Sequence, residues 1–225
     1  MRKLKSLNLK EKLAFVLCLT FIVLAGVYAA SELAGSFTAY MTAQNNRTAT
    51  PGTENIYAAL DQLPDSLINE FCDNGWKIVT WKDTDTFMAA HGFTPSNDYQ
   101  SFFENENHHI SGITNSDEKT IYIKISGESD STIYATTIHE MGHYIDRANG
   151  NLAYSYPFTL CRYKYKEYIS YSNSLTGSRA AYCDINAREY FAVTFTDYFL
   201  HYEYVAENYP ALAHYYDHFV MSKYE

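Results

Sequence analysis

The chain has 225 residues, of which 47% are hydrophobic and 19% are charged. That composition is typical of a folded globular protein and excludes both a disordered chain and a disulfide-stapled miniprotein. Its 26 acidic residues outnumber its 17 basic ones, for a formal net charge of −9. Because nucleic-acid-binding proteins present a basic face, we expect no nucleic-acid partner.

The first 30 residues have the pattern of an export signal. Residues 2–12 contain five basic residues, and a long uncharged segment follows. A basic start, an apolar stretch and small residues at its end predict a cleaved signal peptide over residues 1–30. The segment 13–31 is also long enough to span a bilayer as an uncleaved anchor. We therefore expect a secreted protein. The alternative is a protein anchored to the outer face of the membrane, and we expect contact with a membrane only in that case.

The polar residues 31–55 predict a linker, and residues 56–225 predict one α+β domain. In chain order, the expected elements are helices within 57–74, a strand at 76–81, short helices over 84–106, a strand at 120–126, a helix at 130–148, a loop with one helix over 151–181, and helices at 184–204 and 210–220. Tyrosines are frequent after residue 150, and we expect most of them to pack in the core or in loops.

Cysteine usage indicates little about the site. Cys72, Cys161 and Cys183 follow the apolar segment, and this odd number allows one disulfide, such as Cys161–Cys183, or none. The chain has no Cys-x-x-Cys pair, which argues against a metal site built from thiolates.

The motif that indicates chemistry is His139-Glu140-Met141-Gly142-His143. Residues four apart on a helix face the same side, so both imidazoles can bind one zinc ion. Glu140 would lie beside them, where a carboxylate can accept a proton from a water molecule that the metal activates. The alternative is a helix with two ordinary histidines and a solvated glutamate.

A catalytic zinc ion usually has a third protein ligand, and two acidic residues are candidates. Asp146 shares the helical face of His139, but its Cα would lie about 4.5 Å beyond that of His143 along the axis. A capping role, or a contact to a ligand, suits it better. Glu189 belongs to a helical stripe that also contains Ala192, Val193, Thr196 and Leu200. A carboxylate on so apolar a stripe needs a partner, which a metal or a salt bridge would supply.

Two segments resemble one enzyme family. Tyr182 to Phe195 (Tyr-Cys-Asp-Ile-Asn-Ala-Arg-Glu-Tyr-Phe-Ala-Val-Thr-Phe) is similar to a stretch of the anthrax lethal factor catalytic domain and its relatives, which include secreted bacterial Pro-Pro endopeptidases. In that family a tyrosine stands seven residues before the glutamate that is the third zinc ligand. The block His139–Asp146 resembles the family's His-Glu-x-Gly-His followed by two residues and Asp. The resemblance covers about residues 56–225.

The resemblance implies a role for each site residue. His139, His143 and Glu189 would bind one catalytic zinc ion, and Glu140 would be the general base. The Tyr182 hydroxyl would stabilise the oxyanion, although packing alone is the other interpretation of this tyrosine. The implied fold is a small mixed sheet packed on a zincin-type active-site helix, followed by a mostly helical C-terminal half.

The implied function is that of a secreted, zinc-dependent endopeptidase of the gluzincin type, which hydrolyses peptide bonds in extended peptide or protein segments, including Pro-containing ones. The strand at 120–126 would either form the edge of the cleft and pair with the substrate, as in the family, or be an ordinary amphipathic strand. One departure from the family is Val193, where relatives usually have a second glutamate. Loss of that hydrogen bond to a metal ligand suggests the alternative of a catalytically impaired family member that acts as a peptide- or protein-binding module. A different hydrolase built on the same helix is a further alternative.

Overall fold

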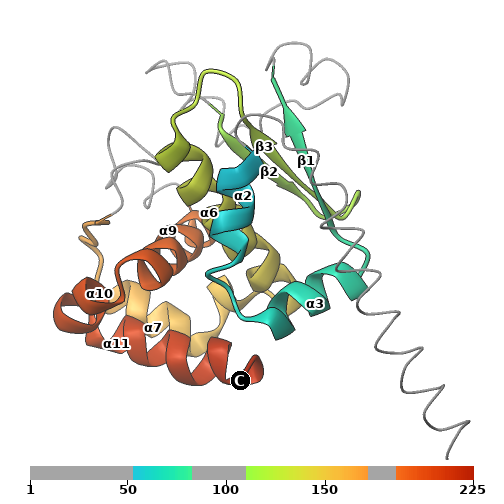
Figure 1. Cartoon of the computed structure of the whole chain (residues 1–225). Coiled ribbons are helices and arrows are strands. Elements are labelled where there is room, and N and C mark those ends of the chain that lie inside the picture. Colours follow the sequence, from blue (N-terminus) through green and yellow to red (C-terminus); the bar gives the residue numbers. More distant parts are fainter. Residues whose placement is uncertain (1–52, 83–109, 172–185) are drawn as a thin grey trace, which may run out of the picture. The chain divides into compact units, whose positions relative to one another are not determined.

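The computed structural model describes residues 53–82, 110–171 and 186–225, which form a small sheet and a larger set of helices (Figure 1). The expected signal peptide and the short helices over 84–106 lie outside these ranges. So does the expected linker over 31–55, except for its last three residues, which are helical. Within the described ranges no helix is both long and apolar enough to cross a membrane.

Two helices precede the sheet, as expected from the sequence. They are α2 (Thr53–Leu60) and α3 (Asp65–Asp73). Pro64 occupies the N-cap of α3, a place where its missing N–H costs no helical hydrogen bond. Beyond the C-terminus, Gly75 adopts a φ of 78°, which is a left-handed conformation that glycine tolerates best.

The sheet has three strands in the order β1-β3-β2. They are β1 (Lys77–Trp81), β2 (Gly112–Asn115) and β3 (Thr120–Lys124). Strand β1 runs parallel to β3, and β2 runs antiparallel to it, so the sheet is mixed, as predicted. The expectation that the strand at 120–126 forms the edge of the cleft is wrong, because β3 lies in the middle. Its first four residues are buried. Strand β2, which was not predicted from the sequence, forms one edge of the sheet that the described strands build.

Helix α6 (Asp130–Ala148) is the central element, and it confirms the helix predicted at 130–148. The N-cap is Ser129, whose hydroxyl accepts a hydrogen bond from the backbone N–H of Thr132. The chain leaves the helix at Asn149, and Gly150 follows with a φ of 82°. Helix α6 packs against α2, the sheet and α9, so most of its length is buried.

The C-terminal half is helical, as expected, but the helices divide more finely than predicted. The elements are η2 (Leu152–Tyr154), α7 (Tyr156–Lys164), α9 (Ala187–Leu200), α10 (Tyr202–Asn208), α11 (Pro210–Tyr215), the π-helical turn η3 (Tyr216–Val220) and η4 (Met221–Lys223). The helix expected at 184–204 breaks at His201, whose φ of −143° is not helical. The helix expected at 210–220 changes to π geometry after Tyr215.

Aromatic side chains fill the core of this half, in agreement with the expected role of the tyrosines. Phe158 packs on Phe191 with ring centroids 4.9 Å apart, and Phe191 packs on Tyr216 at 5.5 Å. The buried Tyr216 hydroxyl donates to the carbonyl of Phe191 over 2.9 Å. Such a bond removes the penalty of burying the hydroxyl group. Cys161 is a free thiol, and the disulfide considered for it involves Cys183, which lies outside the described residues.

Candidate metal centre and active site

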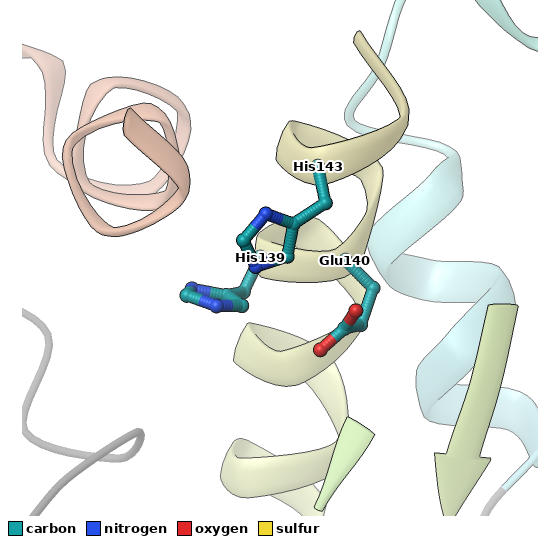
Figure 2. A group of neighbouring side chains, drawn as sticks. All are labelled: His139, Glu140 and His143. Carbon is teal, nitrogen blue, oxygen red and sulfur yellow. The ribbon is translucent and has the colours of Figure 1, made fainter. Parts of the chain in front are cut away.

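The His-Glu-x-x-His motif occupies the buried middle of α6. Ligand atoms of His139, Glu140 and His143 all lie within 4.8 Å of one another. The two imidazole rings are almost perpendicular, at 86°, with centroids 4.8 Å apart. Figure 2 shows both rings projecting from the same side of the helix, with the Glu140 carboxylate beside them. The helical spacing thus places the three side chains together, as predicted.

Glu189 reaches the same point from α9. One of its oxygens, Oε2, lies 3.2 Å from His139 Nε2, and the other, Oε1, lies 3.4 Å from His143 Nε2. The residue is only 2% exposed. Glu189 lies in the first turn of α9, where the side chain of Asn186 accepts hydrogen bonds from the N–H groups of Arg188 and Glu189. This cap determines where the helix begins and therefore where the carboxylate lies.

The charges of these groups are strongly coupled. Burial disfavours a charged imidazole, but the Glu189 carboxylate outweighs burial and raises the pKa of His143 to about 9. Burial likewise favours a neutral Glu189, yet His143 and His139 hold the pKa of that carboxyl well below its ordinary value. Because metal ligands must be deprotonated, a bound divalent cation would take the place of the proton on His143.

The donor set fits a zinc ion. Zinc binds imidazole nitrogen at about 2.0–2.1 Å, so ligand atoms around a tetrahedral ion are about 3.3–3.4 Å apart. The measured separations between Glu189 and the two imidazoles, 3.2 and 3.4 Å, match that spacing. Two nitrogens and one carboxylate also leave a fourth position, as catalytic zinc sites do. Glu189 is a better third ligand than Glu140, because the Glu140 carboxylate is bonded elsewhere.

The Glu140 carboxylate contacts strand β2. The hydroxyl of Thr114 lies 2.6 Å from Glu140 Oε2. A methyl group added to Gly112 would stand 2.6 Å from Glu140 Oε1, closer than side-chain carbons approach other atoms. Glu140 is 5% exposed, so its carboxylate lies in a confined space between α6 and β2.

Asp146 has the structural role expected of it, and its contacts are to the segments that follow α6. It is fully buried, and its Oδ1 accepts a hydrogen bond of 2.7 Å from the N–H of Ala153. Its Oδ2 lies 3.5 Å from the Arg188 guanidinium in α9. Burial raises the pKa of Asp146 despite these partners. The residue ties the end of α6 to η2 and to the beginning of α9.

Close packing of α6 on α9 brings the two halves of the site together. Gly142 lies between the two histidines, and a methyl group there would be 3.1 Å from Ala192 Cα and 3.1 Å from Phe195 Cδ1. Val193 is 4% exposed and belongs to the apolar face of α9. The absence of a side chain at Gly142 therefore allows Glu189 to come within reach of the imidazoles.

Three residues of this site were not predicted from the sequence. Asn186 could have been found, because Asn followed three residues later by Glu is a signature of a helix N-terminus. Thr114 and Gly112 had no such signal, since a strand of four residues has too little pattern. Tyr182, expected to stabilise the oxyanion, lies outside the described residues.

No curated protein sequence matches the chain. Among solved structures, the fold is similar to that of the Pro-Pro endopeptidase PPEP-2 from Paenibacillus alvei, with a TM-score of 0.55. The two chains are 15% identical, and the similarity covers 73% of this chain and 88% of the other. Residues 35–219 match the family described as anthrax toxin lethal factor, N- and C-terminal domain. Since that match spans most of the sequence, the chain belongs to the anthrax toxin lethal factor family.

Proposed function

We propose that the protein is a zinc-dependent endopeptidase of the gluzincin type. The observation that carries this proposal is the meeting of Glu189 with the imidazoles of His139 and His143 at 3.2 and 3.4 Å, which is the spacing of ligands around one zinc ion. Membership of the lethal factor family and the fold shared with a Pro-Pro endopeptidase support it.

In this proposal, side chains of the protein transfer the proton and stabilise the oxyanion. When bound, zinc would polarise the scissile carbonyl and acidify the attacking water. Glu140 accepts the proton of that water and passes it to the leaving amine, as a general base and then a general acid. Tyr182 is proposed to donate a hydrogen bond to the oxyanion, by the family resemblance alone.

The proposed substrate is an extended peptide. Among the described strands, β2 pairs on one side only, with β3, and it lies beside Glu140. An extended peptide can add to such an edge through main-chain hydrogen bonds, so we place the substrate along β2. Pro-containing peptides are the first candidates, because the structurally similar PPEP-2 is a Pro-Pro endopeptidase.

We also propose export of the protein, with residues 1–30 acting as a signal peptide. The support is the basic, apolar and small-residue pattern of this segment. The mature chain would carry 12 basic and 25 acidic side chains. Analysis of the N-terminus of the protein recovered from the medium tests this proposal, and an intact Met1 on membrane-bound protein would favour the anchor.

The test of the enzymatic proposal is cleavage of a diverse peptide library by the zinc-loaded chain without residues 1–30. We expect Glu140→Gln to keep its zinc and to lose about 10²- to 10⁴-fold in kcat, the usual contribution of a general base. Cuts made only by the unaltered protein would establish the protease, and their flanking residues would show whether Pro is required. Full activity in Glu140→Gln would refute the mechanism.

A binding module is the second candidate, and the buried Val193 favours it. Where relatives usually have a second glutamate, this apolar side chain offers no hydrogen bond to a metal ligand. A protein that contains one zinc ion per chain, binds peptides from the library and cuts none of them would match this alternative.

A further inference from the structure

Edge strand β2 contacts the proposed general base through alternate residues. Gly112 and Thr114 lie on the same face of the strand, because successive side chains point to opposite faces. Both approach Glu140. Ile113 points to the other face, where it packs in a separate cluster with Trp81 and Tyr122. One face of β2 thus contacts the carboxylate of the proposed general base, and the other face packs against apolar side chains.

The hydroxyl of Thr114 has one proton and two acceptors within reach. Glu140 Oε2 lies 2.6 Å away, and the backbone carbonyl of Glu140 lies 3.2 Å away. Hydroxyl hydrogen bonds are about 2.5–3.0 Å long, so the shorter contact is the hydrogen bond and the proton points to Oε2. Oε1 then remains available to accept a proton from water.

Gly112 restricts the same carboxylate by steric means. A Cβ atom at this position would meet Glu140 Oε1 at 2.6 Å, Glu140 Cγ at 2.7 Å and the Thr136 methyl group at 2.6 Å. An alanine here would force the side chains of Glu140 and Thr136 to move. The carboxylate therefore lies directly against the backbone of β2.

We propose that Thr114 is a positioning residue, which orients Glu140 for proton transfer, and that Gly112 provides the space this orientation needs. The inference rests on the proposed peptidase function. Strand β2 would then have two roles, because the substrate lies along it and its Thr114 orients Glu140. Thr114 keeps its own proton throughout, while Oε1 of Glu140 receives the water proton and releases it to the amine.

The kinetic test compares Thr114→Val, Thr114→Ser and Thr80→Val in the full mature chain with zinc. Valine keeps the shape of threonine and removes the donor, and serine keeps the donor. Thr80 lies on β1, at the edge of the described sheet opposite β2. We expect Thr114→Val to lower kcat about 10- to 100-fold, with KM and zinc content within about twofold of the unaltered protein. Thr114→Ser is expected to restore most of kcat, and Thr80→Val to leave it unchanged.

A crystal structure of zinc-loaded Thr114→Val provides a readout that does not depend on activity. We expect the Glu140 carboxylate to leave the position it has in the unaltered protein while His139, His143 and Glu189 keep theirs. If the unaltered protein cuts no peptide, the peptidase proposal fails, yet this structure still decides whether Thr114 orients Glu140. Unchanged kcat, an unmoved Glu140, or loss of zinc from Thr114→Val would each overturn the inference.

Gly112→Ala is a second variant, for the case in which Thr114→Val does not fold. Its methyl group would displace Oε1 without removing any hydrogen-bond donor, so the same fall in kcat is expected with zinc retained. Wild-type kcat in a folded Gly112→Ala protein would contradict the proposed confinement of Glu140.

Discussion

Glu189 lies in an apolar environment, where a lone carboxylate would be costly. Burial of an unpaired charge is unfavourable unless a partner of opposite charge or a metal compensates it. Here the compensation comes from His139 and His143, which outweigh burial and hold the pKa of Glu189 well below its ordinary value. These three side chains depend on one another, and we expect substitution of any of them to disturb the others.

We expect Glu189→Ala to lose zinc. Residues that only hydrogen-bond to a metal ligand already contribute about 10- to 100-fold in metal affinity, so removal of a ligand should weaken zinc binding by more than about 100-fold. Metal analysis after dialysis against a weak chelator measures this loss. Glu207→Ala, which removes an exposed glutamate from α10, is the matched control. Full zinc occupancy in Glu189→Ala would rule out the ligand assignment.

At the scale of elements, the site depends on the short distance between α6 and α9. These helices come from regions separated by α7 and η2, and they approach closely at Gly142. Their ends are set by local signals, the Ser129 and Asn186 caps, which can be recognised in the sequence. The distance between the two helices depends on Gly142 of α6, which has no side chain to hold α9 away.

Gly142→Ala tests this distance, because two effects of opposite sign compete. In a helix interior alanine is about 0.8–1.0 kcal/mol better than glycine. Overpacking a core usually costs about 1–3 kcal/mol, and the new methyl group would meet a backbone atom, Ala192 Cα, at 3.1 Å. The difference between these terms is a net destabilisation of up to about 2 kcal/mol, which urea unfolding measures, and we expect weaker zinc binding with it. A variant more stable than the unaltered protein would contradict this prediction, because it would show that α9 can move away from α6 without cost.

Strand β2 illustrates an element that its own residues do not specify. Four residues, Gly112–Asn115, are too few to show an alternating pattern, and two of them disfavour strands. They form a strand because β3 offers a row of hydrogen-bonding partners. The same pairing moves β3 from the expected edge to the middle of the sheet.

At the scale of the whole molecule, zinc should connect parts of the domain that lie far apart in the sequence. The proposed ligands lie on both α6 and α9, so binding of one ion should favour the folded state over the unfolded one. At a free zinc concentration of about 100 times Kd, this linkage contributes about 2.7 kcal/mol.

We expect chelation to lower the melting temperature by several degrees, since about 1 kcal/mol corresponds to 2–4 °C in a domain of this size. Differential scanning calorimetry with and without a chelator measures the shift. The Glu189→Ala protein should melt at the same temperature in both conditions, and an equal shift in that variant would place the metal elsewhere.

The sequence by itself determined the chemistry of the centre, since a helix places His139, Glu140 and His143 on adjacent positions by its own periodicity. Helix caps and strand patterns likewise predicted α3, β1 and α6, because these signals are local. For Glu189 the residues alone left a metal and a salt bridge open, and only the family resemblance implied a ligand. The tertiary structure shows the distances at which Glu189 meets both imidazoles, that the partner of Asp146 is Arg188, and that β2 lies against Glu140. Such contacts arise from packing between distant segments, and their geometry depends on small gaps such as those at Gly112 and Gly142, which no local pattern encodes.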